Sequence, residues 1–304
     1  MPFLVIEGTF QLLDRTRAGQ ITGFEPDGDS IQFKPKNRAL LNKLTRLSQP
    51  VRFSAIGSVQ LRFEGIDALE LHFQGKNQPR PLADDARNFM TKQLGLDPVQ
   101  YSPPSLLRVK PPTPHDGAPG YIISRSLEVH GRPVSFVFSG KPPAKDGQAI
   151  NLTPSLLKRS LNYKSILQGF AYPLFYDTLF KDLRDPLSAA TREARTKKHG
   201  LWTHDGSQTG VRATSDAELQ QTGVTFPKLF RRLTEYYAGP NAGLTKFLSF
   251  PKLHLEQVQN IDPKSPLFTN FTHFDNVIQV KNSKVLLRQA PETLVFVSEK
   301  STKK

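Results

Sequence analysis

The sequence predicts a mixed α+β protein: an OB-type β-barrel with flanking helices over residues 1–205, followed by a smaller α+β C-terminal region over residues 206–304. Hydrophobic residues make up 37% of the chain and include 21 Phe, which is enough for a sizeable core. The 25 Pro and 20 Gly favour turns and long connections over a helical bundle. The predicted elements run in the order strands with hairpins, helix, more strands, then helices, which is typical of an OB-type barrel that ends in helices.

The N-terminal part is predicted to form two hairpins. Turn residues at 25–29, with a Pro and an Asp-Gly pair, join the strands of the first hairpin, and Gly57-Ser58 joins those of the second. The expected strands are 5–13, 21–24, 30–33, 51–56 and the start of 59–73. In this last stretch apolar residues alternate as in a half-buried strand until Gly65, and Arg62, Asp67 and Glu70 are grouped around that break.

Helices and further strands are predicted for the rest of the chain. An amphipathic pattern over 82–94 stops at Gly95, and an alanine-rich pattern over 187–199 stops at Gly200, where a C-cap glycine belongs. The other expected strands are 121–123, 126–129, 134–138, 276–280, 284–288 and 293–298, and another helix is expected near 225–237. The polar stretch 204–216 contains glycine and is expected to be a linker between the two parts.

The charge of the chain favours a polyanionic partner. The formal net charge is +14 and the pI about 9.9, so nucleic acid is the simplest candidate partner. Residues 206–304 carry 13 Lys and Arg against 8 Asp and Glu, which leaves the larger excess on residues 1–205. The first part is therefore the expected location of the main nucleic-acid surface.

Several classes of protein are excluded or made less probable by the composition. The chain has no Cys, which excludes disulfides, cysteine–zinc sites and cysteine nucleophiles. The N-terminus lacks a basic start followed by a long apolar run, so no signal peptide is expected. No apolar run approaches the length of a membrane span. A cytoplasmic protein with no membrane association is expected.

Four motifs, in order, resemble those of the staphylococcal (thermo)nuclease family. Asp27-Gly-Asp29-Ser30 resembles its Asp-Gly-Asp-Thr turn, and Arg62 followed by Gly-Ile-Asp67-Ala-Leu-Glu70 resembles its Arg, then Gly-Ile-Asp-Ala-Pro-Glu. His-Gly-Arg132 resembles its Tyr-Gly-Arg, and the helix ending in Gly-Leu-Trp202 resembles its closing helix. The resemblance covers about residues 3–205, and it rests on the combination and order of the motifs.

The resemblance implies a calcium-dependent phosphodiesterase that hydrolyses DNA or RNA. Arg62 and Arg132 would stabilise the charge that develops on the phosphoryl group, since guanidiniums form bidentate hydrogen bonds to phosphate. Asp29 and Asp67, with the backbone carbonyl of Ala68, would be the oxygen ligands of Ca²⁺. Glu70 would orient or deprotonate the attacking water.

The chain departs from the family pattern at two positions near these residues. Leu69 stands where the family has the proline before its glutamate, so the backbone that carries Glu70 is expected to be less rigid. His130 stands where the family has a tyrosine before Gly-Arg, so one phenol on the substrate side is missing. All five charged residues of the predicted site, Asp29, Arg62, Asp67, Glu70 and Arg132, are present.

Two other functions remain open from the sequence. The first is a catalytically inactive nuclease-like OB domain that binds nucleic acid or protein, although such domains usually lack one of the charged residues. The second is a histidine-based or zinc hydrolase, which is not favoured because the seven His show no metal-ligand spacing. No protein partner can be inferred, and the sequence leaves open DNA or RNA, exo- or endo-action, and the oligomeric state.

The C-terminal region has two possible roles. It is expected to be a structural appendage that covers a barrel edge, in which case the basic residues of its helix face solvent. The alternative is an additional nucleic-acid surface formed by Lys228, Arg231 and Arg232.

Overall fold

The computed structural model describes residues 2–16, 18–45, 49–241, 243–265, 267 and 269–298. They form two compact units that interleave along the chain. Within the described residues, the first unit contains the chain up to Glu64 and Arg87–Ser165, and the second contains Gly65–Ala86 and Ile166–Ser298. The sequence predicts instead a single division after residue 205, into domains 1–205 and 206–304, and this boundary stays a prediction. Residues 299–304 of the predicted second domain lie outside the described part of the chain.

The predicted mixed α+β class is confirmed. In the first unit the elements are β1 (Phe3–Gln11), β2 (Leu13–Arg15), β3 (Ile21–Gly23), β4 (Gln32–Pro35), η1 (Arg38–Lys43), β5 (Val59–Gln60), β6 (Arg62–Phe63), β8 (Ala118–Leu127), β9 (Pro133–Ser139), β10 (Ala149–Ile150) and α2 (Pro154–Leu157). Helices α1 (Arg80–Gln93) and α3 (Leu161–Leu167) each have residues in both units.

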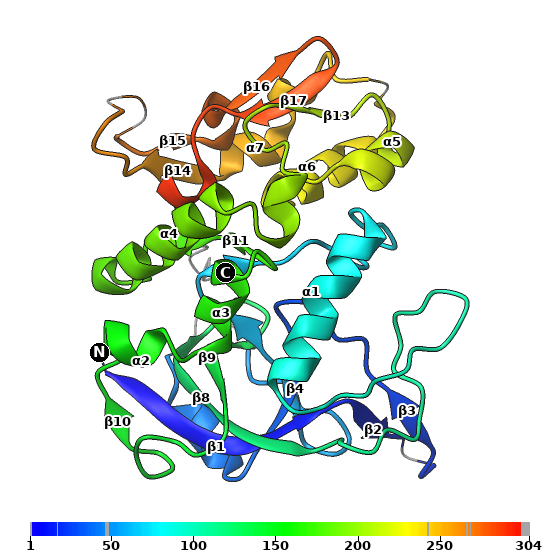
Figure 1. Ribbon diagram of the computed structural model, residues 1–304, viewed down its shortest axis with the longest axis vertical. Coiled ribbons are helices and arrows are strands. Elements are labelled where there is room, and N and C mark those ends of the chain that lie inside the picture. Colours follow the sequence, from blue (N-terminus) through cyan, green and yellow to red (C-terminus); the bar gives the residue numbers. More distant parts are fainter. Residues whose placement is uncertain are drawn as a thin grey trace. The chain divides into compact units, whose positions relative to one another are not determined.

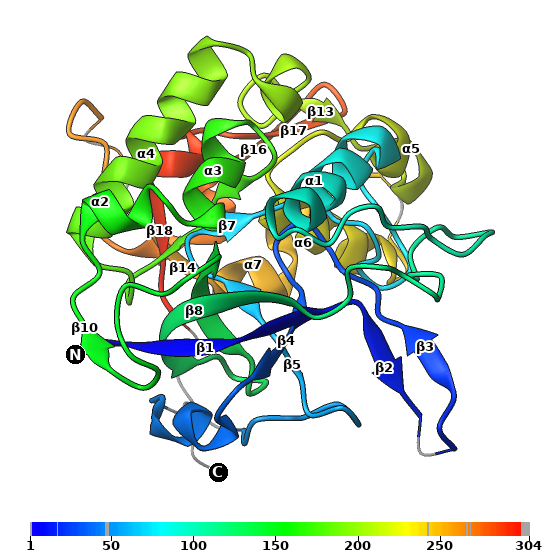
Figure 2. The same ribbon diagram turned by 60° about the horizontal axis from the view of Figure 1, so that its bottom comes forward.

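The main sheet of the first unit has the strand order β5-β4-β1-β8-β9-β6, and β10 also pairs with β1. Figure 1 labels β1, β4, β8, β9 and β10 of this sheet. β1 is antiparallel to both β4 and β8, with Phe10 opposite Phe33 and Val5 opposite Ile123. Figure 2 shows from another side that β4 lies next to β1 and that β5 lies next to β4. Val5, Phe10, Phe33 and Ile123 are fully buried, so the sheet encloses an apolar core.

This sheet is a nearly closed, barrel-shaped sheet. Its two end strands, β5 and β6, are consecutive in the chain and are separated only by Leu61. The side chain of Leu61 is fully buried, and its N–H donates to the Ile31 carbonyl at 2.9 Å. The arrangement is compatible with the predicted OB-type barrel.

The observed strand bounds differ from the predicted ones in two stretches where the backbone is irregular. The stretch Val59–Phe73, expected to begin as one strand, holds three two-residue strands, the third being β7 (Ile66–Asp67). Conversely, β8 is one strand where the sequence predicts two, because a register shift between Ser124 and Ser126 interrupts the alternation of apolar residues.

The second unit combines helices with small sheets. Its elements besides β7 are β11 (Tyr172–Pro173), β12 (Phe175–Tyr176), α4 (Lys181–Thr196), η2 (Gly200–Thr203), β13 (Val211–Arg212), α5 (Asp216–Thr222), α6 (Pro227–Tyr237), η3 (Phe247–Ser249), α7 (Pro251–Leu255), β14 (Gln257–Asn260), β15 (Thr272–His273), η4 (Phe274–Val277), β16 (Ile278–Lys281), β17 (Lys284–Leu287), η5 (Pro291–Thr293) and β18 (Leu294–Phe296). The sheets have the orders β12-β18-β14-β15, β13-β17-β16 and β11-β7.

Helix α6, which carries Arg231, is packed into the core of this unit. It begins with Pro227, which has no N–H to leave unpaired in the first turn. Leu229, Phe230 and Leu233 are fully buried, and so is Phe226 immediately before the helix. The helix is therefore held by its apolar residues as part of the core of the unit.

Two predicted helices are observed with shifted bounds. α1 lies within two residues of the predicted range. α4 begins six residues before the predicted start, because Pro186 lies inside the helix instead of preceding it. None of the helices in the described residues is long and apolar enough to cross a membrane.

Candidate functional site

The six predicted site residues are divided between the two units. Asp29, Arg62 and Arg132 belong to the first unit, whereas Asp67, Ala68 and Glu70 belong to the second.

In the first unit, the chain segments that carry Asp29, Arg62 and Arg132 are neighbours. The N–H of Phe63, next to Arg62 on β6, donates to the Asp29 carbonyl at 3.1 Å. β6 is parallel to β9, with Arg62 opposite Val134, and Arg132 lies just before β9. Hydrogen bonding in and around one sheet therefore brings the three backbone segments together.

Asp29 lies in a tight turn. The N–H of Asp27 donates to the Ser30 carbonyl at 3.1 Å, and the Asp27 carboxylate accepts from the Gly28 N–H at 2.8 Å. Asp27 is buried and therefore acts within the turn, while Asp29 at the tip is half-buried.

The strand pair that carries Arg62 is fixed by a buried asparagine. Asn162, at the start of α3, is fully buried and accepts from the Val137 N–H at 2.9 Å. Its amide donates to the Glu64 carbonyl at 2.8 Å and to the Ser135 carbonyl at 3.0 Å. The side chain thus spans the end of β6 and the adjacent strand β9, and sequence reasoning missed it because a single Asn has no distinctive spacing.

Glu128 fixes the conformation around Arg132. One of its carboxylate oxygens accepts from the backbone N–H groups of His130 and Arg132, each at 3.0 Å. The Arg132 guanidinium also donates to this carboxylate, with Nε at 3.3 Å. Burial would raise the pKa of Glu128, but the charge and hydrogen bonds of Arg132 outweigh it and lower the pKa. Glu128 therefore holds Arg132 as a charged partner, a role that sequence analysis missed.

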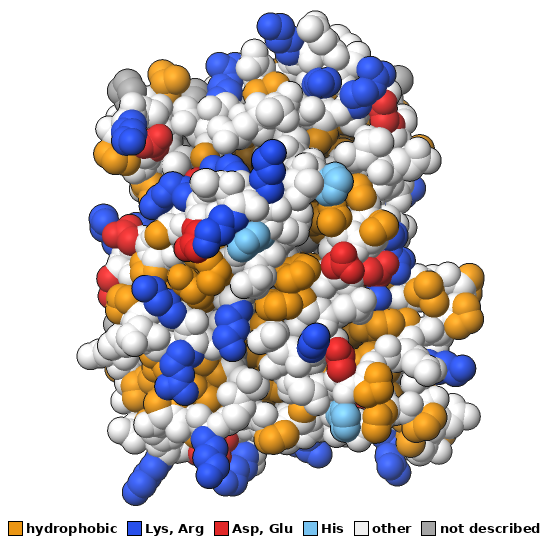
Figure 3. Space-filling view, viewed as in Figure 1, with side chains coloured by type: hydrophobic (Ala, Val, Ile, Leu, Met, Phe, Trp, Pro, Cys, Tyr) orange, Lys and Arg blue, Asp and Glu red, His pale blue; other side chains and the backbone are white. Residues whose placement is uncertain are grey.

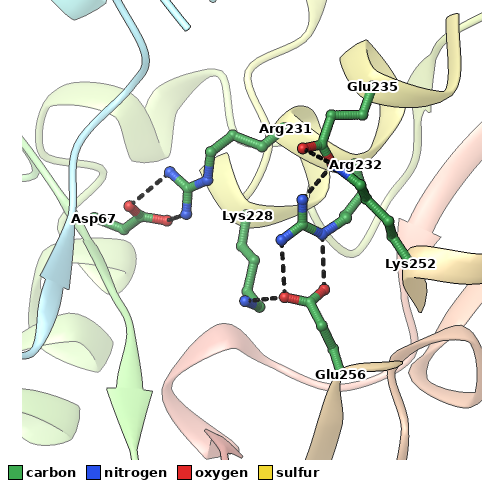
Figure 4. Close-up of polar contacts among 7 residues, drawn as sticks. All are labelled: Asp67, Lys228, Arg231, Arg232, Glu235, Lys252 and Glu256. Carbon is green, nitrogen blue, oxygen red and sulfur yellow. Dashed lines mark hydrogen bonds and ion pairs between the residues drawn. The ribbon is translucent and has the colours of Figure 1, made fainter. Parts of the chain in front are cut away.

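In the second unit, Asp67 forms a buried ion pair with an arginine of the C-terminal region (Figure 4). Arg231, on α6, donates from Nη1 to one Asp67 carboxylate oxygen at 3.0 Å and from Nη2 to the other at 2.9 Å. Nη1 also donates to Oε1 of Glu70. One guanidinium therefore bonds both carboxylates to which the sequence assigns metal binding and water activation.

The ion pairs of Arg231 are electrostatically strong. Burial alone would lower the pKa of Arg231, but the charges of Asp67 and Glu70 outweigh burial and raise it well above its ordinary value. The side chains of Arg231 and Asp67 are 18% and 5% exposed. In such surroundings a bidentate pair is much stronger than it would be on the surface.

Next to this pair, Lys228 and Arg232 of the same helix bind another carboxylate, that of Glu256 (Figure 4). Arg232 donates to both oxygens of Glu256, at 2.9 and 3.0 Å, and Lys228 pairs with Glu256 as well. Lys228 is buried, with Nζ 4.7 Å from the centre of the Phe296 ring. Both expectations for these basic residues, a solvated face or a nucleic-acid surface, are therefore wrong: they are largely buried in ion pairs within their unit.

A buried glutamine connects the segment after Asp67 with the entry to α6. Gln78 is fully buried, and its side-chain amide donates to the carbonyls of Gly223 at 2.9 Å and Thr225 at 2.8 Å. Its side-chain oxygen accepts from the Glu70 N–H at 3.2 Å. The backbone of Glu70 and the segment before Arg231 are therefore held by one side chain.

The positions between the two carboxylates are buried. Ala68 and Leu69 are 3% and 1% exposed. Leu69 contributes to the core, so burial together with Gln78 restrains the backbone that carries Glu70.

The carboxylates have the chemistry of calcium ligands, but their arrangement does not fit the ion. Calcium takes six to eight oxygen ligands, often with bidentate carboxylates. Both oxygens of Asp67 and one of Glu70 already accept hydrogen bonds from Arg231. A dication at Asp67 would lie against this guanidinium. Among the described residues, no group of three or more His, Cys, Asp or Glu is placed to hold a metal ion.

On the face that Figure 3 shows, the positive charge of the described residues does not form a single block. On the described part of the face in Figure 3, Lys and Arg side chains are scattered among polar and apolar ones.

Neither a protein-family model nor a curated protein matches this sequence. The resemblance described from the motifs therefore stays a prediction.

Proposed function

We propose that the chain is a nuclease that hydrolyses phosphodiester bonds of DNA or RNA, with calcium as its cofactor in the cleaving state. The observation that carries the proposal lies in the first unit: the segments of Asp29, Arg62 and Arg132 adjoin one another through β6 and β9. A phosphodiester gains negative charge as it is attacked, and two arginines can neutralise this charge with bidentate hydrogen bonds. The net charge of +14 supports a nucleic-acid substrate.

In this proposal each residue keeps the role that its motif implies. Arg62 and Arg132 contact the phosphoryl oxygens, and Glu70 orients or activates water. Asp29, Asp67 and the carbonyl of Ala68 are the proposed calcium ligands. Because Arg231 bonds Asp67 and Glu70 in the described arrangement, the cleaving state requires Arg231 to release them.

The proposal is tested with the full chain and end-labelled single-stranded DNA, duplex DNA and RNA. We expect cleavage with Ca²⁺, none with EDTA, and a large loss of rate for Arg62→Ala. Arg52→Ala is the matched control, because Arg52 is an exposed arginine ten residues earlier in the chain. Absence of cleavage by the unaltered chain with Ca²⁺, Mg²⁺ and Mn²⁺ on all three substrates would overturn the proposal.

The pairing of Arg231 with Asp67 and Glu70 favours a second candidate function. In an inactive domain that only binds nucleic acid or protein, Arg231 would neutralise these carboxylates permanently. Such a domain would bind nucleic acid, with affinity falling steeply as salt is raised, but would cleave none of the substrates under any metal.

A further inference from the structure

We propose that Arg231 is an internal cation that excludes a divalent metal ion from Asp67 and Glu70, so that metal binding requires its guanidinium to leave. The inference rests on the calcium site of the proposed function. Arg231 donates two hydrogen bonds to Asp67, at 2.9 and 3.0 Å, and one to Glu70. These bonds use the oxygens that a calcium ion would need, and like charges cannot share them at contact distance.

The backbone of α6 does not depend on this ion pair for its position. Leu229, Phe230 and Leu233 anchor the helix in the core. Lys228 and Arg232 anchor it again through Glu256. Because these contacts hold the helix, we expect the Arg231 side chain to be able to change rotamer while α6 stays in place.

The Arg231 side chain is not fully enclosed by its unit. The Arg231 side chain is 18% exposed and the Glu70 side chain 14%, compared with 5% for Asp67. A side chain sealed in the core would need the unit to open before it could leave, whereas Arg231 needs only a rearrangement of its own side chain. We therefore expect a metal ion to replace the guanidinium at Asp67 without unfolding of the unit.

The backbone segments that carry Asp67 and Glu70 are held in place independently of Arg231. Asp67 is on β7, which pairs with β11, and the backbone of Glu70 is bonded to Gln78. When the guanidinium leaves, the two carboxylates remain close together, as a hard dication requires. Loss of the arginine charge should then increase affinity for calcium instead of abolishing it.

The test is calcium binding by isothermal titration calorimetry on EDTA-treated full chain, with no substrate present. We expect Arg231→Met to bind Ca²⁺ at least about tenfold more tightly than the unaltered chain, equivalent to about 1.4 kcal/mol. Adding Asp67→Asn to Arg231→Met should abolish the gain. Arg232→Met is the matched control, since Arg232 is the adjacent arginine of the same helix but pairs with Glu235 and Glu256, and it should show no gain.

Arg231→Lys provides a second variant if Arg231→Met does not fold. It keeps a positive charge but loses the bidentate fork, so we expect a smaller gain in calcium affinity. The inference is wrong if the folded Arg231 variants bind Ca²⁺ no more tightly than the unaltered chain, or if Arg232→Met gains as much. Tighter calcium binding without any cleavage would support the inference and count against the nuclease, whereas cleavage without tighter binding would do the reverse.

Discussion

Glu70 and Gln78 are joined by two hydrogen bonds in opposite directions. The Gln78 N–H donates to the Glu70 carbonyl at 2.8 Å, and the Glu70 N–H donates to the Gln78 side-chain oxygen at 3.2 Å. The same side chain donates to the carbonyls of Gly223 and Thr225. A loop that follows the central motif of the sequence is thereby held to the C-terminal region within one unit.

Gln78→Leu should destabilise the protein. The substitution leaves one buried N–H and two buried carbonyls without partners, and such losses together cost about 3 kcal/mol. Urea unfolding followed by circular dichroism measures the change. Gln221→Leu is the control because Gln221 is exposed on α5, and it should change the free energy of unfolding little. Equal effects of the two substitutions would contradict the structural role of Gln78.

Removing one partner of the Asp67–Arg231 ion pair should lower the free energy of unfolding, measured in EDTA so that no metal ion is bound. Arg231→Met leaves the buried Asp67 carboxylate without its cation and should cost about 3–5 kcal/mol, whereas Asp67→Asn leaves Arg231 paired with Glu70 and should cost less. The double variant should lose less than the sum, because neither charge then remains. A double-mutant cycle of unfolding free energies measures this coupling, and strictly additive losses would show that the ion pair does not form in solution.

Glu256 should make stability depend on pH in the acid range. Burial would raise its pKa, but Lys228 and Arg232 outweigh burial and lower the pKa from 4.5 to about 2. A carboxyl with a lowered pKa stabilises the fold above its unfolded pKa, and this contribution is lost as the pH falls from about 4.5 to about 2. The contribution amounts to about 3 kcal/mol.

Unfolding measured between pH 7 and pH 2 checks this prediction. Glu256→Gln should be less stable than the unaltered chain at pH 6, and the difference should shrink toward pH 2. Asp185→Asn, which removes an exposed partner of Lys181, should show little difference at any pH. A constant difference for Glu256→Gln across the range would contradict the lowered pKa.

Gly65→Ala should cost more stability than Gly75→Ala. The two glycines have φ angles of +75° and +76°. An alanine at either position should therefore lower the stability by about 1 kcal/mol, because it disfavours the left-handed conformation. A Cβ at Gly65 would also lie 2.9 Å from Leu187 Cδ1, whereas a Cβ at Gly75 meets nothing within 4 Å. Thermal melts of both variants separate the conformational cost from the packing cost. Equal losses would mean that Leu187 moves aside freely.

Arg132→Lys should impair cleavage while leaving the fold intact. Lysine keeps the charge but not the bidentate geometry, so kcat/KM should fall by roughly 10²–10³-fold if Arg132 stabilises the transition state. Lys164→Ala, on α3 of the first unit, is a control for loss of general positive charge. A change in KM alone would instead indicate that Arg132 only binds substrate.

The sequence predicted elements with strong periodicity better than those with irregular backbone. The amphipathic pattern of α1 placed that helix within two residues. The carboxylate segment was harder, because β5, β6 and β7 are only two residues long each, and closure of the sheet depends on tertiary hydrogen bonds that a sequence pattern does not record.

For the candidate site, the motifs identified Asp67 and Glu70 but not the partner that bonds them. Arg231 and Arg232 are consecutive in the sequence, a pattern that is typical of the basic, solvent-facing side of a helix. Only the packing of α6 shows that one arginine bonds Asp67 and the other Glu256. A pairing between residues so far apart in the chain has no local sequence signal, so it could not be predicted.

The separation between Asp67 and Arg231 also has a consequence during synthesis. The arginine lies 164 residues after the aspartate, so at typical elongation rates it is made roughly 10–30 s later. During that interval the nascent chain carries Asp67 and Glu70 without the guanidinium that bonds them in the finished protein. A chain that stops before α6 would keep both carboxylates open to ions from solution, so this ion pair is formed only by a protein whose translation has passed residue 231.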